Sequence, residues 1–311
     1  MGKLLPIARG FTGLNNRDDP HRIKYDPETG IQDLAVAVNV DVDSTLRVGR
    51  RKGYVKKLTL PDGAHSVFCD GYDCIFVTDD ALSVLQPDYT HAPIRNVTIG
   101  ARMSCAQIGE RTYYANGHER GYVAGGSSYP WLRNPALPVP PGYPPGSWQF
   151  YDPPTGHLLA AFNGAIFVAQ GDTVWSSEPY FVEYFRLAKT GRRFSGRITM
   201  MRPVHDGLYV SDGNSTFFLQ GQKGGAASVM EVRRIMSYPA IFGTDVVADG
   251  GRIGNGSMPG PVIMWTSPRG ICVGGPGGQF QNLTEKRLAI PSSIEGCAFY
   301  SDGKYVVSLF P

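Results

Sequence analysis

Short apolar runs recur along the chain in pairs, and a glycine-centred turn divides each pair. Residues 158–162 and 165–168, on either side of Gly164, are a clear example. Two such runs joined by a short turn predict a β-hairpin. The hairpins recur about every 35 to 60 residues, an interval typical of propeller blades. They comprise residues 66–77, 103–115, 158–168, 200–210, 262–273 and 297–309.

This recurrence predicts an all-β protein, a β-propeller of about six blades. The chain has 311 residues, and six blades of about four strands each would take up most of them. Its 39 glycines and 24 prolines suit a fold with many tight turns. We find no long stretch with the period of an amphipathic helix, so helix should be scarce.

The domain organisation follows from where the pattern fails. Residues 1–33 carry successive turn signals and are predicted to be an irregular N-terminal segment, followed by a single propeller domain over 34–311. Insertions are predicted at 129–154, which is rich in proline, and at 243–261, which is rich in glycine. Because a propeller leaves no open sheet edge, the strands near 34–48 are expected to supply the closing edge.

The insertion at 129–154 has two interpretations. Its prolines prevent regular strand ladders and favour an extended conformation. It is either a crossing between blades that packs on the surface, or an arm that reaches a neighbouring subunit. In the second case the apolar anchors at the subunit interface would be Trp131, Tyr143, Trp148 and Phe150.

Charge is mild overall, with a formal net charge of +3, but two basic groups lack acidic residues. One lies between Ser44 and Pro61, and the other lies between Arg186 and Arg202. Both are compatible with solvated turns. In a ring oligomer they would instead repeat around a lumen and form a cationic collar for a polyanion. The cations are Arg47, Arg50, Arg51, Lys52, Lys56 and Lys57 in the first group, and Lys189, Arg192, Arg193 and Arg197 in the second.

The five cysteines show no metal-ligand spacing. Cys69 and Cys74 flank one hairpin turn and can pair across it, whereas Cys105, Cys272 and Cys297 lie in apolar runs, as small hydrophobic residues do. Reduced thiols are the expected state. The N-terminus lacks the apolar core of a signal peptide, and no apolar run is long enough to span a bilayer, so membrane insertion is not expected.

Motifs for catalysis are missing from the sequence. It contains no Gly-x-Ser-x-Gly elbow, P-loop, His-Glu-x-x-His motif or closely spaced Cys/His quartet. Asp18, Asp19 and His21 lie in one proline-punctuated turn and are interpreted as turn-forming groups. We therefore expect no enzyme activity, no catalytic residues, no cofactor and no metal site.

Two sets of segments carry a resemblance to known proteins. They are residues 10–20, 37–43 and 50–54 in the N-terminal half, and residues 175–180, 196–201 and 204–210 in the middle of the chain. In these segments, which touch both halves of the chain, the sequence resembles virion proteins of tailed bacteriophages, a group that includes the β-propeller tail hub, nozzle and DNA-stabilisation proteins of short-tailed phages.

The resemblance implies a structural role in the phage tail, after synthesis in the host cytoplasm. Identical subunits, which we expect to number six, would form a ring below the portal and adaptor, with fibre proteins docked outside. Double-stranded DNA would pass through the ring and be held without sequence specificity. The cations expected to face the DNA are Arg50, Arg51, Lys52, Arg192, Arg193 and Arg197.

Two other classes of function fit a propeller. One is a glycan-binding or glycan-hydrolysing protein at a cell surface, in which tryptophans would stack on sugar rings. The other is a cellular interaction scaffold. The tryptophans available for stacking are Trp131, Trp148, Trp175 and Trp265.

Overall fold

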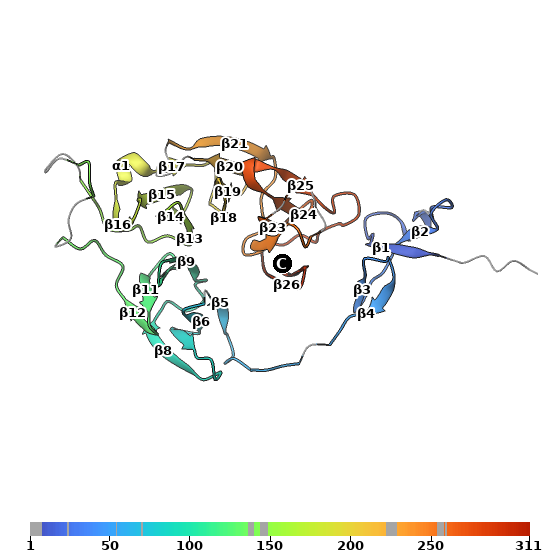
Figure 1. The fold of residues 1–311 in the computed structure, drawn as a ribbon, viewed down its shortest axis with the longest axis horizontal. Coiled ribbons are helices and arrows are strands. Elements are labelled where there is room, and N and C mark those ends of the chain that lie inside the picture. Colours follow the sequence, from blue (N-terminus) through green and yellow to red (C-terminus); the bar gives the residue numbers. More distant parts are fainter. Residues whose placement is uncertain are drawn as a thin grey trace, which may run out of the picture.

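The fold is a ring of small sheets with a separate module beside it (Figure 1). The computed structural model describes residues 8–23, 25–53, 55–69, 71–135, 140–143, 149–221, 229–253, 258 and 260–311. The prediction of an all-β propeller is confirmed, because strands form the sheets and the α-helix α1 (Leu187–Thr190) is a single turn. None of the described helices is long and apolar enough to cross a membrane.

Five blades are antiparallel sheets of at least four strands, in which spatial order follows chain order. Blade 1 consists of β5 (His65–Cys69), β6 (Cys74–Thr78), β7 (Ala81–Leu85) and β8 (His91–Asn96). Blade 2 consists of β9 (Ser104–Ile108), β10 (Arg111–Ala115), β11 (Arg120–Ala124) and β12 (Ser127–Tyr129). Blade 3 consists of β13 (Leu158–Phe162), β14 (Ala165–Gln170), β15 (Thr173–Glu178), β16 (Phe181–Phe185) and β17 (Arg192–Arg193), which pairs with β15.

Blades 4 and 5 repeat this arrangement. Blade 4 consists of β18 (Met200–Val204), β19 (Gly207–Ser211), β20 (Thr216–Gln220) and β21 (Glu231–Met236). Blade 5 consists of β22 (Val246–Asp249), β23 (Pro261–Ser267), β24 (Gly270–Gly274) and β25 (Phe280–Asn282), with the 3-10 turn η3 (Pro276–Gly278) between the last two. Blade 6 has two strands, β26 (Glu295–Ser301) and β27 (Lys304–Phe310). All six predicted hairpins are present.

Apolar side chains from neighbouring blades meet in buried clusters, which hold the ring together. Ile75 of blade 1 packs with Val123 of blade 2, and Phe167 of blade 3 packs with Leu208 of blade 4. Similar clusters join blades 2 and 3, blades 4 and 5, and blades 5 and 6. None of the clusters found in the described residues joins blade 6 to blade 1. Burial of each large apolar side chain contributes about 1.5–3 kcal/mol. The junction between blades 6 and 1 therefore lacks the apolar burial that stabilises the other junctions between blades.

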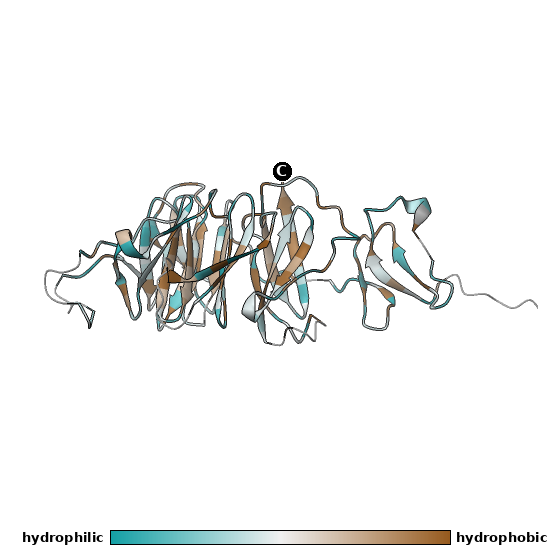
Figure 2. Cartoon of the chain, turned by 90° about the horizontal axis from the view of Figure 1, so that it is seen from above, coloured by the Kyte–Doolittle hydropathy of each residue, from teal (hydrophilic) through white to brown (hydrophobic). Residues whose placement is uncertain are grey.

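Residues 8–50 form a module at the side of the ring, within the same layer (Figure 2). Its elements are β1 (Gly10–Leu14), the 3-10 turn η1 (Pro20–Arg22), β2 (Ile31–Leu34), β3 (Val40–Val42) and β4 (Val48–Arg50). The prediction that 1–33 is irregular is wrong for β1 and β2, which pair in parallel. A search for hairpins misses this pair, because parallel strands need a long connection and no shared tight turn.

Two other predictions about boundaries need correction. The propeller does not begin at residue 34, because β3 and β4 pair with each other in the module and the ring begins at β5. They therefore do not supply the closing edge within this subunit. The segment 243–261 is not an insertion, because it contains β22, the innermost strand of blade 5. In contrast, the described part of 130–157 contains no strand and makes one isolated bridge, Tyr151 with Phe185.

Candidate functional site

The innermost strands of the blades surround a cavity of about 550 Å³ at the axis of the ring. Side chains from β5, β9, β13, β18 and β26 line it, together with the connection that precedes β22. The charged residues of the lining are Arg102, Arg202 and Asp245. The described residues contain no group of three His, Cys, Asp or Glu side chains able to hold a metal ion.

Arg102 connects blade 6 to the start of blade 2. Its Nη1 donates a 2.9 Å hydrogen bond to the carbonyl oxygen of Gly296 and lies 3.8 Å from the Glu295 carboxylate. The guanidinium also lies over the Phe242 ring, 5.2 Å from its centroid. Since adjacent carbonyl, carboxylate and aromatic groups all favour a cation, Arg102 holds the inner strand of blade 6 at the axis.

A second ionic contact joins blades 4 and 5. Arg202, in β18, donates from Nε to the carboxylate of Asp245, which immediately precedes β22. The Asp245 side chain is buried, and its charge raises the pKa of Arg202. His157 also lines the axial cavity, with Nε2 2.8 Å from the Ile198 carbonyl oxygen. Because a carbonyl oxygen only accepts, Nε2 carries the proton. Burial lowers the pKa of His157, so its neutral form is favoured.

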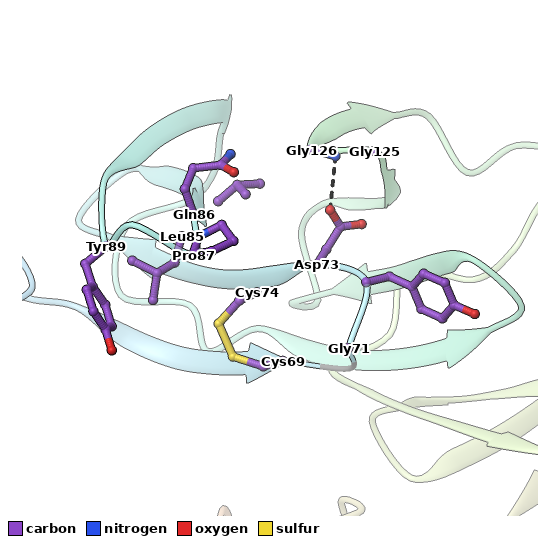
Figure 3. Close-up of a pocket in the computed structure, with 12 residues that line it drawn as sticks. Cys69, Gly71, Asp73, Cys74, Leu85, Gln86, Pro87, Tyr89, Gly125 and Gly126 are labelled. Atoms are coloured by element: carbon purple, nitrogen blue, oxygen red, sulfur yellow. Dashed lines mark hydrogen bonds between the residues drawn. A yellow bond between two sulfur atoms is a disulfide. The ribbon is translucent and has the colours of Figure 1, made fainter.

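A second cavity, of about 500 Å³, is lined mainly by the β5–β6 and β7–β8 turns of blade 1 and the β11–β12 turn of blade 2 (Figure 3). Tyr72 and Tyr89, both exposed, contribute to its lining, and Asp73 accepts a 3.0 Å hydrogen bond from the backbone N–H of Gly126. A disulfide joins Cys69 to Cys74 at one side of this cavity. The expectation of reduced thiols is therefore wrong for this pair, whose Cα atoms are 4.1 Å apart across the β5–β6 ladder.

The other three cysteines are free. Cys105 and Cys272 are buried, as their apolar surroundings predict. Burial raises the pKa of the Cys272 thiol to about 12. Cys297 is exposed instead, because it lies on the face of β26 that no blade covers.

The six cations predicted to face DNA do not converge within one subunit. Arg50, Arg51 and Lys52 end β4 and begin the segment after it, and all three are exposed. Arg192 and Arg193 form β17 on blade 3, and Arg197 follows in the connection to β18. The module that carries β4 and the blade that carries β17 lie on opposite sides of the ring (Figure 1).

The two groups also differ in their partners. Arg193 makes a 2.7 Å ion pair with Asp172, and Arg192 donates to the Met230 carbonyl oxygen at 2.9 Å. In the first group, Arg51 makes a 3.4 Å contact with Asp41. The first group is part of a longer basic segment, defined here as residues 47–57, in which every described residue is exposed. Its cations are Arg47, Arg50, Arg51, Lys52, Lys56 and Lys57.

The predicted interface aromatics lie largely inside the subunit. Trp131 is fully buried and donates from Nε1 to the Val182 carbonyl oxygen at 3.2 Å. Phe150 is also buried, and Tyr143 donates a 2.8 Å hydrogen bond to Glu178. The prediction that Trp131 and Phe150 are exposed anchors is wrong, because an apolar pocket between blades 2 and 3 was available to hold the start of the proline-rich segment. Trp148 lies outside the described residues.

The tryptophans considered for glycan stacking are similarly placed. Trp265 is fully buried between blades 4 and 5, and Trp131 is buried as above. Trp175 is partly buried and donates to the Leu187 carbonyl oxygen at 3.2 Å. The N–H groups of Trp131 and Trp175 are therefore engaged within the subunit, and the rings of Trp131 and Trp265 are buried away from any sugar.

Blade 6 is open toward blade 1. One face of its hairpin packs on blade 5 through Tyr300 and Tyr305. The other face leaves Phe299 51% and Phe310 42% exposed, and Val67 of blade 1 is 57% exposed. Val67 and Phe299 both line the axial cavity. Large apolar groups that remain exposed together mark surfaces that associate with something else.

Sequence reasoning missed the axial residues Arg102, Arg202 and Asp245. The available signal was Arg202 itself, a charged residue inside the apolar run 200–204. A charge at such a position requires a partner when the strand is buried. The sequence does not identify that partner, because Asp245 is contributed by the next blade.

Comparison with known proteins finds similarity to solved structures alone. No protein-family model and no curated protein matches the chain. Among solved structures, it is similar to an extracellular domain from B. thetaiotaomicron, with 10% identity over 84% of this chain and a TM-score of 0.46. This chain spans about a third of that protein, 33% of its length. A gluconolactonase from Xanthomonas campestris shows 13% identity over 76% of this chain and 79% of its own, with a TM-score of 0.44. The Pan2 WD40 domain of Neurospora crassa shows 12% identity over 78% and 73%, with a TM-score of 0.41.

Proposed function

We propose that this chain is a structural subunit of a short-tailed phage tail, a hub or nozzle component. Copies of the chain form a ring, with six as the expected number, and the ring conducts or retains double-stranded DNA below the portal and adaptor. The role is mechanical and uses no catalytic residue, cofactor or metal. The sequence resemblance in residues 10–20, 37–43 and 50–54, and in residues 175–180, 196–201 and 204–210, motivates this proposal.

The observation that carries the proposal is the incomplete closure of the subunit. Blade 6 has two strands where the other blades have at least four, and its outward face exposes Phe299 and Phe310. A protein that acts alone gains stability by closing such a ring, since open edges invite association. An incomplete blade suits a subunit whose surface is finished by assembly.

The basic segment 47–57 provides the contact with DNA. Its cations are exposed, and they lie beside the ring on a segment without strand pairing after Arg50. Cations of this kind bind phosphates without reading the sequence, and they do so with strong salt dependence because bound counterions are released. The adaptor, portal and fibre proteins are the protein partners of the proposed ring.

The mass of the protein in solution and its DNA binding together test the proposal. We expect native mass spectrometry to show a closed oligomer. We also expect that oligomer to retain double-stranded DNA of any sequence at low salt and release it at high salt. A protein that stays monomeric at all accessible concentrations, or an oligomer that does not bind DNA even at low salt, would contradict the proposal.

A further inference from the structure

Blade 6 ends in an unpaired edge. β27 pairs with β26 over seven residues, and no described strand lies on its other side. The outer backbone groups of β27 therefore lack the ladder that β7 and β24, for example, provide in their blades. An edge strand of this length is a template for the addition of another strand.

The chain itself contains the missing half of a blade. β3 and β4 form an antiparallel pair and directly precede β5, the innermost strand of blade 1. In the complete blades, the third and fourth strands likewise precede the innermost strand of the next blade, as β7 and β8 precede β9. By chain order, β3 and β4 are thus the third and fourth strands of the blade before blade 1, which is blade 6.

The two halves have matching surfaces. Asp41 of β3 contacts Lys304, the first residue of β27, through a charge-assisted hydrogen bond. Val48 of β4 is exposed, as are Phe299 and Phe310 on the blade 6 hairpin. Addition of β3 and β4 at the β27 edge would pair its backbone groups and place Val48 in the same sheet as these apolar side chains.

The module is anchored close to this edge without pairing to it. Asn16 and the backbone of Ala289 form a hydrogen bond of 2.8 Å, and Arg287 lies 3.7 Å from the carboxylate of Asp33. Although these two contacts and the Asp41–Lys304 contact hold the module near blade 6, β3–β4 and β26–β27 remain separate sheets within the subunit. These contacts lie within one chain and place its β3–β4 hairpin beside its own β27 edge, and a neighbouring copy carries the same residues for the same contacts.

The connection after β4 is long enough to reach another copy. Fourteen residues, 51–64, separate Arg50 from His65, whereas seven, 97–103, separate β8 from β9. Fully extended, the longer connection spans up to about 50 Å, comparable with the roughly 45 Å diameter of a compact domain of this size. Every described residue of 51–57 is exposed and four of the seven residues are basic, so like charges favour an extended connection.

We propose that the β3–β4 hairpin of one copy adds to the β27 edge of a neighbouring copy and completes its blade 6. This inference rests on the proposed ring, because each copy then gives a hairpin to one neighbour and accepts a hairpin from the other. Such a head-to-tail exchange repeats the contacts seen within one subunit. It gives a closed ring when a whole number of equal rotations between copies makes one full turn.

Cysteine cross-linking between two differently tagged chains tests the exchange. One chain carries Asp41→Cys and the other Lys304→Cys, both with Cys297→Ser to remove the exposed thiol. We expect co-expression to give a disulfide-linked species containing both tags, at least about tenfold above a matched pair in which Asp88→Cys replaces Asp41→Cys. The reason is that docked residues face each other at an effective concentration near the millimolar range. Asp88 is an exposed aspartate in the β7–β8 turn, whereas the Asp41 side chain is 28% exposed.

The doubly substituted chain, Asp41→Cys with Lys304→Cys, shows which copy supplies the hairpin. A link within single chains, with no link between the two tagged chains, would overturn the inference and assign the hairpin to its own blade. Absence of both links would overturn it as well. Native mass spectrometry of the same samples separates this inference from the proposed function. A ring without a link between the tagged chains would contradict only the exchange of hairpins. A monomer would contradict both the exchange and the proposed function.

The wild-type sequence provides a second measurement that does not depend on the variants. Unlabelled and heavy-nitrogen-labelled chains are refolded together and treated with carbodiimide, which joins the Lys304 amine to the Asp41 carboxylate. Exchange between copies predicts that about half of the linked peptide pairs combine the two labels. Linked pairs that carry a single label throughout would contradict the proposal.

Discussion

Replacement of Trp131 separates a role in the subunit core from a role at a subunit interface. One of the two interpretations of the segment 129–154 placed this residue on an arm that reaches a neighbouring subunit, whereas the structure buries it completely between blades 2 and 3. We consider Trp131→Ala, which removes the indole, and Trp131→Phe, which keeps an aromatic ring and removes the N–H group.

The structure gives the expected magnitudes. The indole lies 5.1 Å from the Tyr113 ring and 6.0 Å from the Phe185 ring, centroid to centroid, in edge-to-face arrangements. Loss of a fully buried aromatic side chain costs about 3–5 kcal/mol of folding free energy. Trp131→Phe loses the 3.2 Å hydrogen bond to the Val182 carbonyl oxygen, which costs about 1–2 kcal/mol. Packing therefore accounts for the larger part of the loss in Trp131→Ala.

Urea unfolding followed by circular dichroism measures both losses, with the mass of the assembled protein as a parallel readout. We expect Trp131→Ala to lower the unfolding midpoint at an unchanged slope, and Trp131→Phe to lower it by less than half as much. A change of less than about 1 kcal/mol in Trp131→Ala, combined with loss of assembly, would refute the core assignment and restore Trp131 as an interface anchor.

Three other predictions concern charge, pH and thiol reactivity. Replacement of Arg50, Arg51 and Lys52 by Ser should weaken DNA binding and reduce the slope of log affinity against log salt by about 2–3. The matched triple at Arg192, Arg193 and Arg197 should do less, since Arg192 donates to Met230 of blade 4 and Arg193 pairs with Asp172 of blade 3. An equal effect of the two triples would count against this assignment. Burial lowers the pKa of His157 in the folded protein below its value near 6.5 in the unfolded chain. The stability that neutral His157 contributes is therefore present above pH 6.5 and is lost as the pH falls through the pKa of the folded state. The drop in unfolding midpoint from pH 7.5 to pH 5.5 should be smaller in His157→Gln than in the wild type. An identical drop in the two proteins would contradict this prediction. Iodoacetamide at pH 8 should label exposed Cys297 and leave buried Cys272 unmodified, as detected by mass spectrometry. The reason is that a thiol with a pKa of about 12 is protonated at pH 8. Rapid labelling of Cys272 would contradict this and show that blade 5 opens.

Local patterns were enough to predict the hairpins of the ring. An apolar run, a glycine turn and a second apolar run, as in residues 158–168, depend only on near neighbours in the chain. The same reasoning found the residues that become β3 and β4, although it placed them in the ring. What it could not find depends on contacts between distant residues. The parallel pairing of β1 with β2 has no common turn, and the short β22 is surrounded by glycines that resemble a loop.

The candidate site was less predictable than the fold. A basic group such as Arg192 and Arg193 has the same sequence pattern whether it faces a lumen or pairs with Asp172 on its own blade. The burial of Trp131 likewise depends on the pocket formed by Tyr113, Val182 and Phe185, which come from two blades. Conversely, the open edge of β27 is visible only when the strands of every blade are paired.

Imaging of the assembled protein with DNA at side-chain resolution tests whether copies of this chain close into a ring around DNA. We predict a closed ring of identical copies in which blade 6 of each copy has four strands and the basic segment 47–57 faces the DNA. A ring in which β27 keeps a free edge and the segment 47–57 points away from the DNA, or particles that consist of single chains, would contradict it.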